Sequence, residues 1–401
     1  MSNLFEHSET LGSIGAIAMG MLLMQIPAVA LLLSRLLQGP GRLPPLKPMP
    51  SVPGNVGKVS VVVPTLNEAE RIDPCLAGLS RQGYEVREVL VVDSHSQDGT
   101  GDRVKAAQKR DPRFRLMHDD PLPGDWVGRP WALHNGFLAS SEGSRWILGI
   151  DADTQPQPGL VSSLVQVAEA EGYDLVSLAP RFILKYPGEV WLQPALLITL
   201  LYRFGPAGAG GDEAERVMAN GQCFLCRRSL LVDLGGYSLA RRSFCDDVTL
   251  ARAAARQGAK VGFLDGANLL KVRMYEGARE TWSEWGRSLD LKDACSPAQK
   301  WGDLGFLLAV QGLPPLLTPL LMVVVAMGGA IAPVWMALGI NAVLLLIRFA
   351  LLGAIASSYD LSGAKGRWLF WLSPLADPLA VLRILLSSLQ TPRQWRGRIY
   401  R

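Results

Sequence analysis

The chain opens with a long apolar segment. Residues 11–37 contain one charged residue, Arg35, and are long enough to cross a bilayer as a tilted helix. They have neither the basic start nor the small-residue cleavage site of a signal peptide, so we predict a retained transmembrane anchor over residues 1–37. Residues 38–57 hold six prolines and predict a stiff linker to the next part of the chain.

A second apolar region lies near the C-terminus, over residues 301–401. Residues 304–333 contain no charged residue and residues 334–358 contain only Arg348. They predict two membrane spans joined by a short hairpin. Prolines interrupt the first half of this region, which places the start of its first span near Leu316.

A third apolar stretch, residues 368–389, is less suited to crossing the membrane. It holds two prolines together with Asp377 and Arg383. Four arginines follow it, at positions 393, 396, 398 and 401. They would lie outside the cell if the stretch crossed, against the positive-inside rule, so we predict a re-entrant or interfacial segment.

Between the membrane segments, short apolar strands alternate with helices. Apolar, β-branched runs begin at Val59, Glu88 and Trp146, and helical spacing of apolar residues follows over residues 68–82 and 102–109. This alternation predicts βαβ units and a mostly parallel sheet, hence a Rossmann-like α/β domain, in the soluble part that runs from residue 58 to residue 300. The glycine-rich dinucleotide fingerprint and the Walker loop are both absent from the sequence.

Three aspartates follow the predicted strands directly. Asp93 ends the second strand, and Asp151 and Asp153 follow the third. Ligands bind at the carboxyl ends of strands in open α/β sheets, so the pair at 151 and 153 is a candidate site for a divalent cation shared with a phosphate, and Asp93 for a base or a ribose. The alternatives are solvated turn aspartates for the pair and a turn or helix cap for Asp93.

Arg129 stands where a glycine-bounded loop leads into a predicted helix. A fixed cation at the start of a helix is a natural phosphate contact. The alternative is a surface arginine before a packed helix.

Charge and cysteine content narrow the cellular setting. The net charge of +4 comes from basic residues beside the membrane segments, which indicates attraction to anionic lipid rather than nucleic acid. Arg35, Arg42 and Lys47 follow the first span, which predicts a cytoplasmic α/β domain in a multi-pass protein of the inner or plasma membrane. The five cysteines fit a reducing compartment, and Cys223 and Cys226 fit a buried strand better than a zinc site.

Four short motifs occur in order along the α/β domain: Val61-Val-Val-Pro-Thr-Leu-Asn-Glu-Ala, Val92-Asp-Ser-x-Ser-x-Asp-Gly-Thr, Gly128-Arg-Pro-Trp-Ala-Leu and Asp151-Ala-Asp. Together they resemble the inverting glycosyltransferases of family 2, which have the GT-A fold. Within that family the chain looks most like the membrane subgroup described as hopene-associated or carotenoid glycosyltransferases. The resemblance covers roughly residues 59–291.

The resemblance implies roles for individual residues. It implies a nucleotide-sugar donor, carrying UDP or GDP, and Mg²⁺ or Mn²⁺ held by Asp151 and Asp153. Asp247 matches the family's general base, and it follows Asp246, which stands in the place of a glutamate. The alternative is that Asp246 and Asp247 merely cap a helix over residues 248–257. The nucleotide-sugar contacts that the resemblance implies are Pro64, Asn67, Glu68, Asp93, Arg129, Asp151 and Asp246.

Two further segments bear on the acceptor. Polymerising synthases of this family carry Gln-x-x-Arg-Trp after the base, and residues 273–287 do not match that spacing, so we expect one transfer per acceptor. Trp282 and Trp285 in this segment are interfacial anchors, a lid or simple core residues. Residues 187–204 predict an interfacial helix that brings the membrane to the catalytic crevice, with a buried core helix as the alternative.

The sequence thus favours a membrane-bound, inverting glycosyltransferase that moves a sugar to the hydroxyl of a carotenoid-like or hopanoid-like lipid. A polyprenyl phosphate is the alternative acceptor. A non-catalytic sugar-nucleotide-binding scaffold is the alternative of another class.

Overall fold

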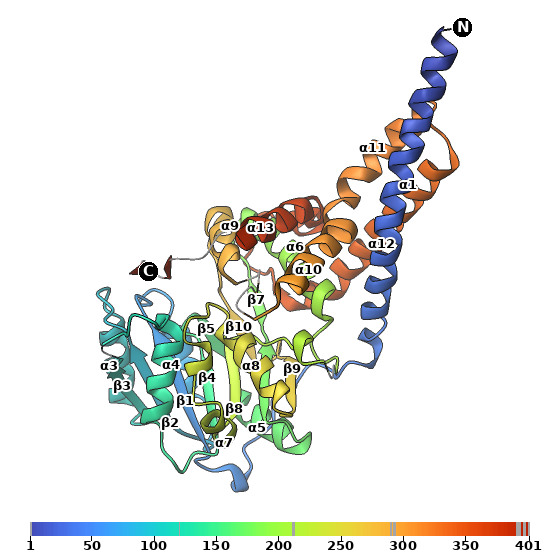
Figure 1. Cartoon of the computed structure of the whole chain (residues 1–401). Coiled ribbons are helices and arrows are strands. Elements are labelled where there is room, and N and C mark those ends of the chain that lie inside the picture. Colours follow the sequence, from blue (N-terminus) through green and yellow to red (C-terminus); the bar gives the residue numbers. More distant parts are fainter. Residues whose placement is uncertain are drawn as a thin grey trace.

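The computed structural model describes residues 2–119, 121–210, 213–288, 291, 294–389, 394–395 and 398–399. An α/β domain forms one end of the molecule, and α1 (Ser2–Leu36), α11 (Pro314–Ala326) and α12 (Ala332–Ile355) project from the other end (Figure 1). Of the predicted C-terminal arginines, Arg393, Arg396 and Arg401 lie outside the described residues.

A seven-stranded sheet forms the centre of the α/β domain, in the order β3-β2-β1-β4-β8-β6-β9. The first four strands in this order are parallel, and β8 runs antiparallel to both of its neighbours. The predicted mostly parallel sheet is confirmed. The strands are β1 (Val59–Thr65), β2 (Val86–Asp93), β3 (Phe114–His118), β4 (Trp146–Ile150), β6 (Leu175–Ala179), β8 (Cys223–Arg227) and β9 (Val261–Asp265).

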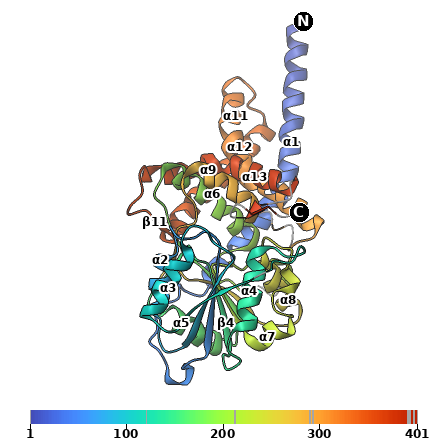
Figure 2. The same cartoon turned by 90° about the vertical axis from the view of Figure 1, so that its left-hand side faces the viewer.

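Helices cover both faces of this sheet (Figure 2). One face is covered by α2 (Asp73–Ser80), α3 (Thr100–Arg110) and α5 (Leu160–Ala170), whose apolar side chains share a core with alternate residues of β1 and β2. The other face is covered by α4 (Gly128–Ala139), α7 (Arg228–Asp233) and α8 (Asp246–Arg256). Cys223 and Cys226 are buried in β8, as expected for a strand.

A second, four-stranded sheet joins the α/β domain to the C-terminal part of the chain. Its order is β11-β7-β10-β5. Three of its strands, β5 (Thr154–Pro156), β7 (Arg181–Ile183) and β10 (Leu270–Val272), belong to the α/β domain. The fourth, β11 (Tyr359–Asp360), comes after α12 and pairs with β7, so the chain returns to the α/β domain after the apolar helices.

The apolar helices match the predicted membrane segments in length and composition. Within the part of the chain that the structure describes, three helical stretches are long and apolar enough to cross a membrane: Leu11–Gly41, Ala332–Ser358 and Arg367–Leu389. Helix α11 passes this test only together with the preceding helical stretch, Pro297–Gly312, from which it is bent by 50°. The proline pair at 314 and 315 stands at this bend, where the sequence predicts the start of a span.

The predicted re-entrant or interfacial stretch consists of a 3₁₀ helix, η7 (Arg367–Ala376), and α13 (Asp377–Leu389). Helix α13 lies at the base of α11 and α12, against α6 (Pro187–Phe204) and α9 (Gly277–Ser288) (Figure 1). Whether this stretch crosses the bilayer stays a prediction. In α6, 11 of the 18 residues are buried, as the alternative of a buried core helix predicts. Its place at the membrane interface stays a prediction.

An ion pair ties the last apolar stretch to α12. Arg348 Nε lies 2.7 Å from Asp377 Oδ2, and both side chains are at most 3% exposed. Arg348 also donates to Ser373 Oγ over 3.1 Å, and Gln311 donates to Asp377 Oδ1 over 3.2 Å. A charge pair this deeply buried is stable only while both partners are present.

We therefore expect Asp377→Ala to destabilise the protein by about 3–5 kcal/mol, because it leaves the Arg348 charge buried without its partner. Combining Arg348→Met with Asp377→Leu should recover most of this loss, since it removes both charges. Thermal unfolding of the detergent-solubilised protein measures both changes. Asp102→Ala is the matched control, because that side chain is 83% exposed. Equal stability of Asp377→Ala and the control would contradict the prediction.

Candidate active site

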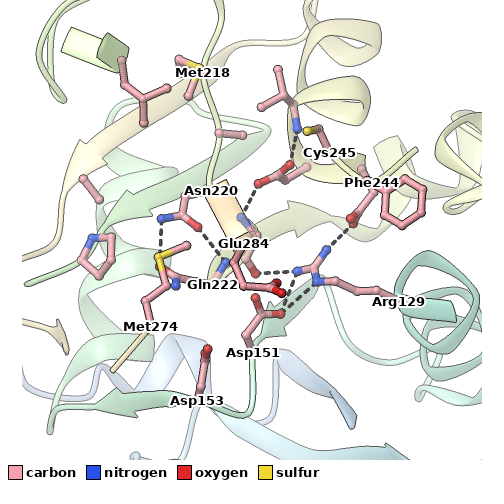
Figure 3. Close-up of a pocket in the computed structure, with 18 of the residues that line it drawn as sticks. Arg129, Asp151, Asp153, Met218, Asn220, Gln222, Phe244, Cys245, Met274 and Glu284 are labelled. Carbon is pink, nitrogen blue, oxygen red and sulfur yellow. Dashed lines mark hydrogen bonds and ion pairs between the residues drawn. The ribbon is translucent and has the colours of Figure 1, made fainter. Parts of the chain in front are cut away.

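The predicted pair of aspartates lies on a turn at the carboxyl end of β4. All five residues of β4 are buried, and Asp151 follows the last of them directly. The hydroxyl of Thr154 donates to the Asp151 carbonyl oxygen over 2.8 Å and closes the turn. Both carboxylates therefore project from the sheet edge into one cavity of about 250 Å³ (Figure 3). Of the predicted site residues, seven line this cavity: Pro64, Glu68, Arg129, Asp151, Asp153, Asp246 and Asp247.

Arg129, in the first turn of α4, connects the two acidic pairs. Its Nε and Nη2 atoms donate to Asp151 Oδ1 over 3.0 and 2.9 Å, and its Nη1 atom pairs with Asp246 Oδ2. Burial of the guanidinium opposes its charge, but Asp151 and Asp246 outweigh burial and raise the pKa of Arg129. The alternative of a surface arginine does not describe this side chain, which is 15% exposed.

Asp247 is held by backbone amides and has the environment of a base. Its Oδ2 atom accepts from the Gly221 N–H over 2.5 Å, and its Oδ1 atom accepts from the Val248 N–H over 2.8 Å. Burial, and then the neighbouring charge of Asp246, raise the pKa of Asp247 to about 7. A carboxylate with a pKa near neutrality is suited to accept a proton.

The structure also supports the alternative in which Asp246 and Asp247 stabilise the start of a helix. Asp246 and Asp247 are the first two residues of α8, where negative charge is favourable to the helix dipole. The N-cap position is Cys245, and no side chain caps the helix there. Both carboxylates thus stabilise the helix start and face the cavity at once.

Asn67 and Asp93 lie beside the cavity and are not among the residues that line it. The Asp93 carboxylate accepts from Thr65 Oγ1 over 3.1 Å, from Ser96 Oγ over 2.5 Å and from the Ser96 N–H over 3.1 Å. Ser96 Oγ in turn accepts from the Asn67 N–H over 2.8 Å. Asp93 therefore forms a turn, which is the alternative role that the sequence allowed for it. This turn joins the loops after β1 and β2. Its predicted contact with a nucleotide stays a prediction.

Several cavity residues carry no local sequence signal. Glu280 and Glu284 come from α9, and Asn220, Gly221 and Gln222 come from the loop before β8 (Figure 3). The loop is fixed by bonds between its own residues, because Asn220 Nδ2 donates to Gln222 Oε1 and the Gln222 N–H donates to Asn220 Oδ1, each over 3.0 Å. Only the Asn-Gly dipeptide, a common turn signal, could have pointed to it.

The Gly221 peptide lies between Arg129 and Asp247, and a side chain does not fit there. Its carbonyl oxygen accepts from Arg129 Nη2 over 2.8 Å. A Cβ atom at this position would lie 2.4 Å from Arg129 Nη2 and 2.9 Å from its Cζ.

We therefore expect Gly221→Ala to displace Arg129 and lower kcat/KM by at least about tenfold, the effect of losing one hydrogen bond to a charged group. Steady-state kinetics with the nucleotide sugar measures this. Gly54→Ala is a suitable control, since a Cβ there meets no atom within 4 Å. If Gly221→Ala kept wild-type kcat/KM, Arg129 would not need its present position.

The carboxylates fit a divalent cation that shares its coordination with the substrate. Both bonds from Arg129 end on Oδ1 of Asp151, so Oδ2 of Asp151 is outside them. Asp153 lines the same cavity. Among the residues that the structure describes, no group of three or more His, Cys, Asp or Glu could hold a metal. Mg²⁺ typically binds one or two carboxylates plus substrate phosphates, so two carboxylates suffice if a diphosphate supplies the rest.

Another part of the cavity wall is apolar. Leu196, Leu197 and Leu200 of α6 line it, together with Phe182 of β7 and Tyr359 of β11. The rings of Phe182 and Tyr359 lie 5.7 Å apart. This wall therefore belongs to the elements that connect the α/β domain with the apolar helices. Trp282 and Trp285 are not among the residues that line the cavity. Trp285 is fully buried in the core beside α6, as the alternative of a simple core residue predicts.

Comparison with known proteins gives one matching family and several relatives. Residues 60–235 match the family described as Glycosyl transferase family 2. A 4,4'-diaponeurosporenoate glycosyltransferase of Staphylococcus haemolyticus is 24% identical over 234 residues, which are 58% of this chain and 60% of the relative. An undecaprenyl-phosphate mannosyltransferase of Micrococcus luteus is 33% identical over 113 residues, 27% of this chain and 43% of the relative. The chain thus spans less than two thirds of the length of these relatives.

A solved structure matches along nearly the whole chain. It is a mannosyltransferase from Pyrobaculum calidifontis in complex with GDP-Man and Mn²⁺. The match covers 94% of this chain and 98% of the other, with 19% identity and a TM-score of 0.53. At this identity the match shows the fold alone, and the expected GT-A fold is confirmed.

Proposed function

Because residues 60–235 form a family 2 glycosyltransferase domain, we propose that this chain transfers a sugar from a nucleotide sugar to the hydroxyl of a membrane lipid. One observation carries the proposal. A single cavity joins the strand-end carboxylates and Asp247 to an apolar wall made by α6 and β11, next to the apolar helices. A lipid can enter along that wall while a sugar nucleotide occupies the polar part.

The chemistry is a single displacement that inverts the anomeric carbon. Asp247 takes the proton of the acceptor hydroxyl while the acceptor oxygen forms a bond to C1 of the sugar. The nucleoside diphosphate leaves from the opposite face of C1. Arg129 binds the diphosphate, and Asp151 and Asp153 would hold Mg²⁺ or Mn²⁺. When bound, the metal offsets the negative charge of the leaving diphosphate.

The nucleotide part of the donor, UDP or GDP, lies along the ends of β1 and β2. Asp93 accepts from its base or ribose, and Pro64, Asn67 and Glu68 shape the loop beside it. Asp246 positions Arg129, which it contacts directly. One sugar is transferred per acceptor, because the chain lacks the polymerase motif of the family.

The domain acts at the cytoplasmic face of the cell membrane, since Arg35, Arg42 and Lys47 follow the first span. A carotenoid-like or hopanoid-like lipid fits the apolar wall, and the carotenoid-type name of one relative supports this class. The name of the Micrococcus luteus relative favours a polyprenyl phosphate as the second candidate acceptor.

The test is to incubate the purified full chain with a panel of labelled UDP- and GDP-sugars and total membrane lipids. We expect one donor to give a labelled lipid that carries a single sugar. Binding of a sugar nucleotide without any labelled lipid would favour the scaffold alternative, and a ladder of products would contradict a single transfer.

A further inference from the structure

The apolar part of the cavity wall contains an amide that has no partner in the protein. Gln193 of α6 is 5% exposed and lines the cavity. Its amide makes no hydrogen bond with any residue that the structure describes, yet neither amide atom is sealed off by neighbouring side chains. A buried amide without a partner is costly, so this one needs a ligand group in the cavity that supplies the missing hydrogen bonds.

Gln193 stands at one end of a row of leucines on α6. Leu196, Leu197 and Leu200 follow it at helical spacing and line the same cavity. The row extends for about 10 Å along the helix, at about 1.5 Å per residue. A molecule that binds here meets leucine side chains and an amide together. The hydroxyls of a sugar would face the leucines without partners, whereas a lipid can lay its chain along them and its polar end at Gln193.

A tyrosine hydroxyl on the same wall is open as well. Tyr359 of β11 is 3% exposed, and its ring lies 5.7 Å from the ring of Phe182 and 5.5 Å from that of Phe370. Its hydroxyl makes no hydrogen bond with the described part of the chain and is not sealed off, in contrast to the enclosed hydroxyl of Tyr202 in the same core. Because Tyr359 lines the cavity, its hydroxyl is a second uncharged group that awaits a partner there.

The hydrogen-bonding capacity of these two groups defines their ligand. An amide accepts through its oxygen and donates through its nitrogen, and a tyrosine hydroxyl does both. A ligand hydroxyl satisfies either kind of atom, whereas an ester carbonyl only accepts. Resting on the proposed function, we infer that the lipid acceptor carries a further hydroxyl besides the one that receives the sugar, and that Gln193 binds it. Gln193 is then a specificity-determining residue that selects a lipid with a diol or polyol end.

The first test counts the hydroxyls of the acceptor and needs no variant. The purified full chain is incubated with its preferred labelled donor and total membrane lipids, and the sugar is then removed from the labelled lipid. Acetylation adds one acetyl group to each hydroxyl of the freed lipid, and mass spectrometry counts them. We expect at least two acetyl groups, one for the hydroxyl that carried the sugar and one or more for those that bind the wall.

The second test asks whether Gln193 reads the further hydroxyl. With the isolated acceptor lipid, Gln193→Leu should lower kcat/KM for the acceptor about tenfold, because the lipid hydroxyl then faces an apolar side chain of similar size. Tyr359→Phe removes one hydroxyl and should lower it about threefold, the effect of one hydrogen bond between uncharged groups. Gln108→Leu makes the same substitution at an exposed position of α3 and should keep the wild-type value.

The outcomes separate the inference from the proposed function. A freed lipid that takes up a single acetyl group would overturn the inference and leave the transfer to lipids intact. A wild-type kcat/KM for the acceptor in Gln193→Leu would also overturn it, and so would a rise in the KM for the donor alone, which would assign Gln193 to the sugar. Absence of transfer to any lipid would overturn the proposed function, and the inference would fall with it. The acetyl count decides the inference even if a variant fails to fold.

Discussion

Asp247→Asn is expected to lower kcat by about 10²–10⁴, the usual contribution of a positioned general base. Asparagine keeps the size of the side chain and one of the two oxygens that accept from the Gly221 and Val248 N–H groups, and it removes the proton affinity. Donor affinity should survive, because Arg129 contacts Asp151 and Asp246 rather than Asp247. Initial rates with the lipid acceptor and titration of the donor separate the two effects.

Asp246→Asn is the matched comparison one residue away. It weakens the hold on Arg129, so it should act mainly on donor affinity. If Asp247→Asn kept a near-normal kcat, Asp247 would be a helix-start residue only, and Asp246 would be the next candidate base.

The same base predicts the pH dependence of transfer. Burial and the charge of Asp246 raise the pKa of Asp247 to about 7, so below that pH the carboxyl group is protonated and cannot accept a proton. We expect kcat/KM to rise about tenfold per pH unit below 7 and to level off above it. The residual activity of Asp247→Asn should lack this rise. A wild-type profile that is flat between pH 5 and 8 would contradict the assignment.

Asp153→Ala should reduce transfer by at least about 10²-fold, because a bound metal supplies several kcal/mol of charge stabilisation in the transition state. Donor binding should fall as well, since the donor diphosphate and the metal complete one another's contacts. The fold should remain, because Asp153 lies on a turn and alanine keeps the carbonyl oxygen that accepts from the Arg273 N–H.

Removal of the metal is the independent control for this prediction. EDTA should abolish turnover of the wild-type chain, and Mg²⁺ or Mn²⁺ should restore it, while Asp153→Ala should not respond to added metal. Unchanged turnover in EDTA would show that Asp151 and Asp153 serve the donor without a cation.

The sequence by itself determined the elements whose signals are local. Apolar runs placed β1, β2 and β4 within one or two residues, since a buried strand needs consecutive apolar residues and ends where polar ones begin. The same rule placed Asp151 and Asp153 at the carboxyl end of a strand. The long uncharged stretches likewise gave the apolar helices, because length and composition suffice for that inference.

Only the tertiary structure decided which distant residues share the cavity. Arg129, Gly221 and Asp246 are far apart along the chain, and their contacts arise where the first turns of α4 and α8 meet the loop before β8. Helix α6 has the composition of an interfacial helix, and it is buried because α9, α13 and η7 pack around it. Glu280 and Glu284 carry no local sequence signal, and they belong to the cavity because the buried Trp285 fixes the rotation of α9. Local patterns report burial, whereas a site also needs the relative placement of elements, which the packing of the whole chain sets.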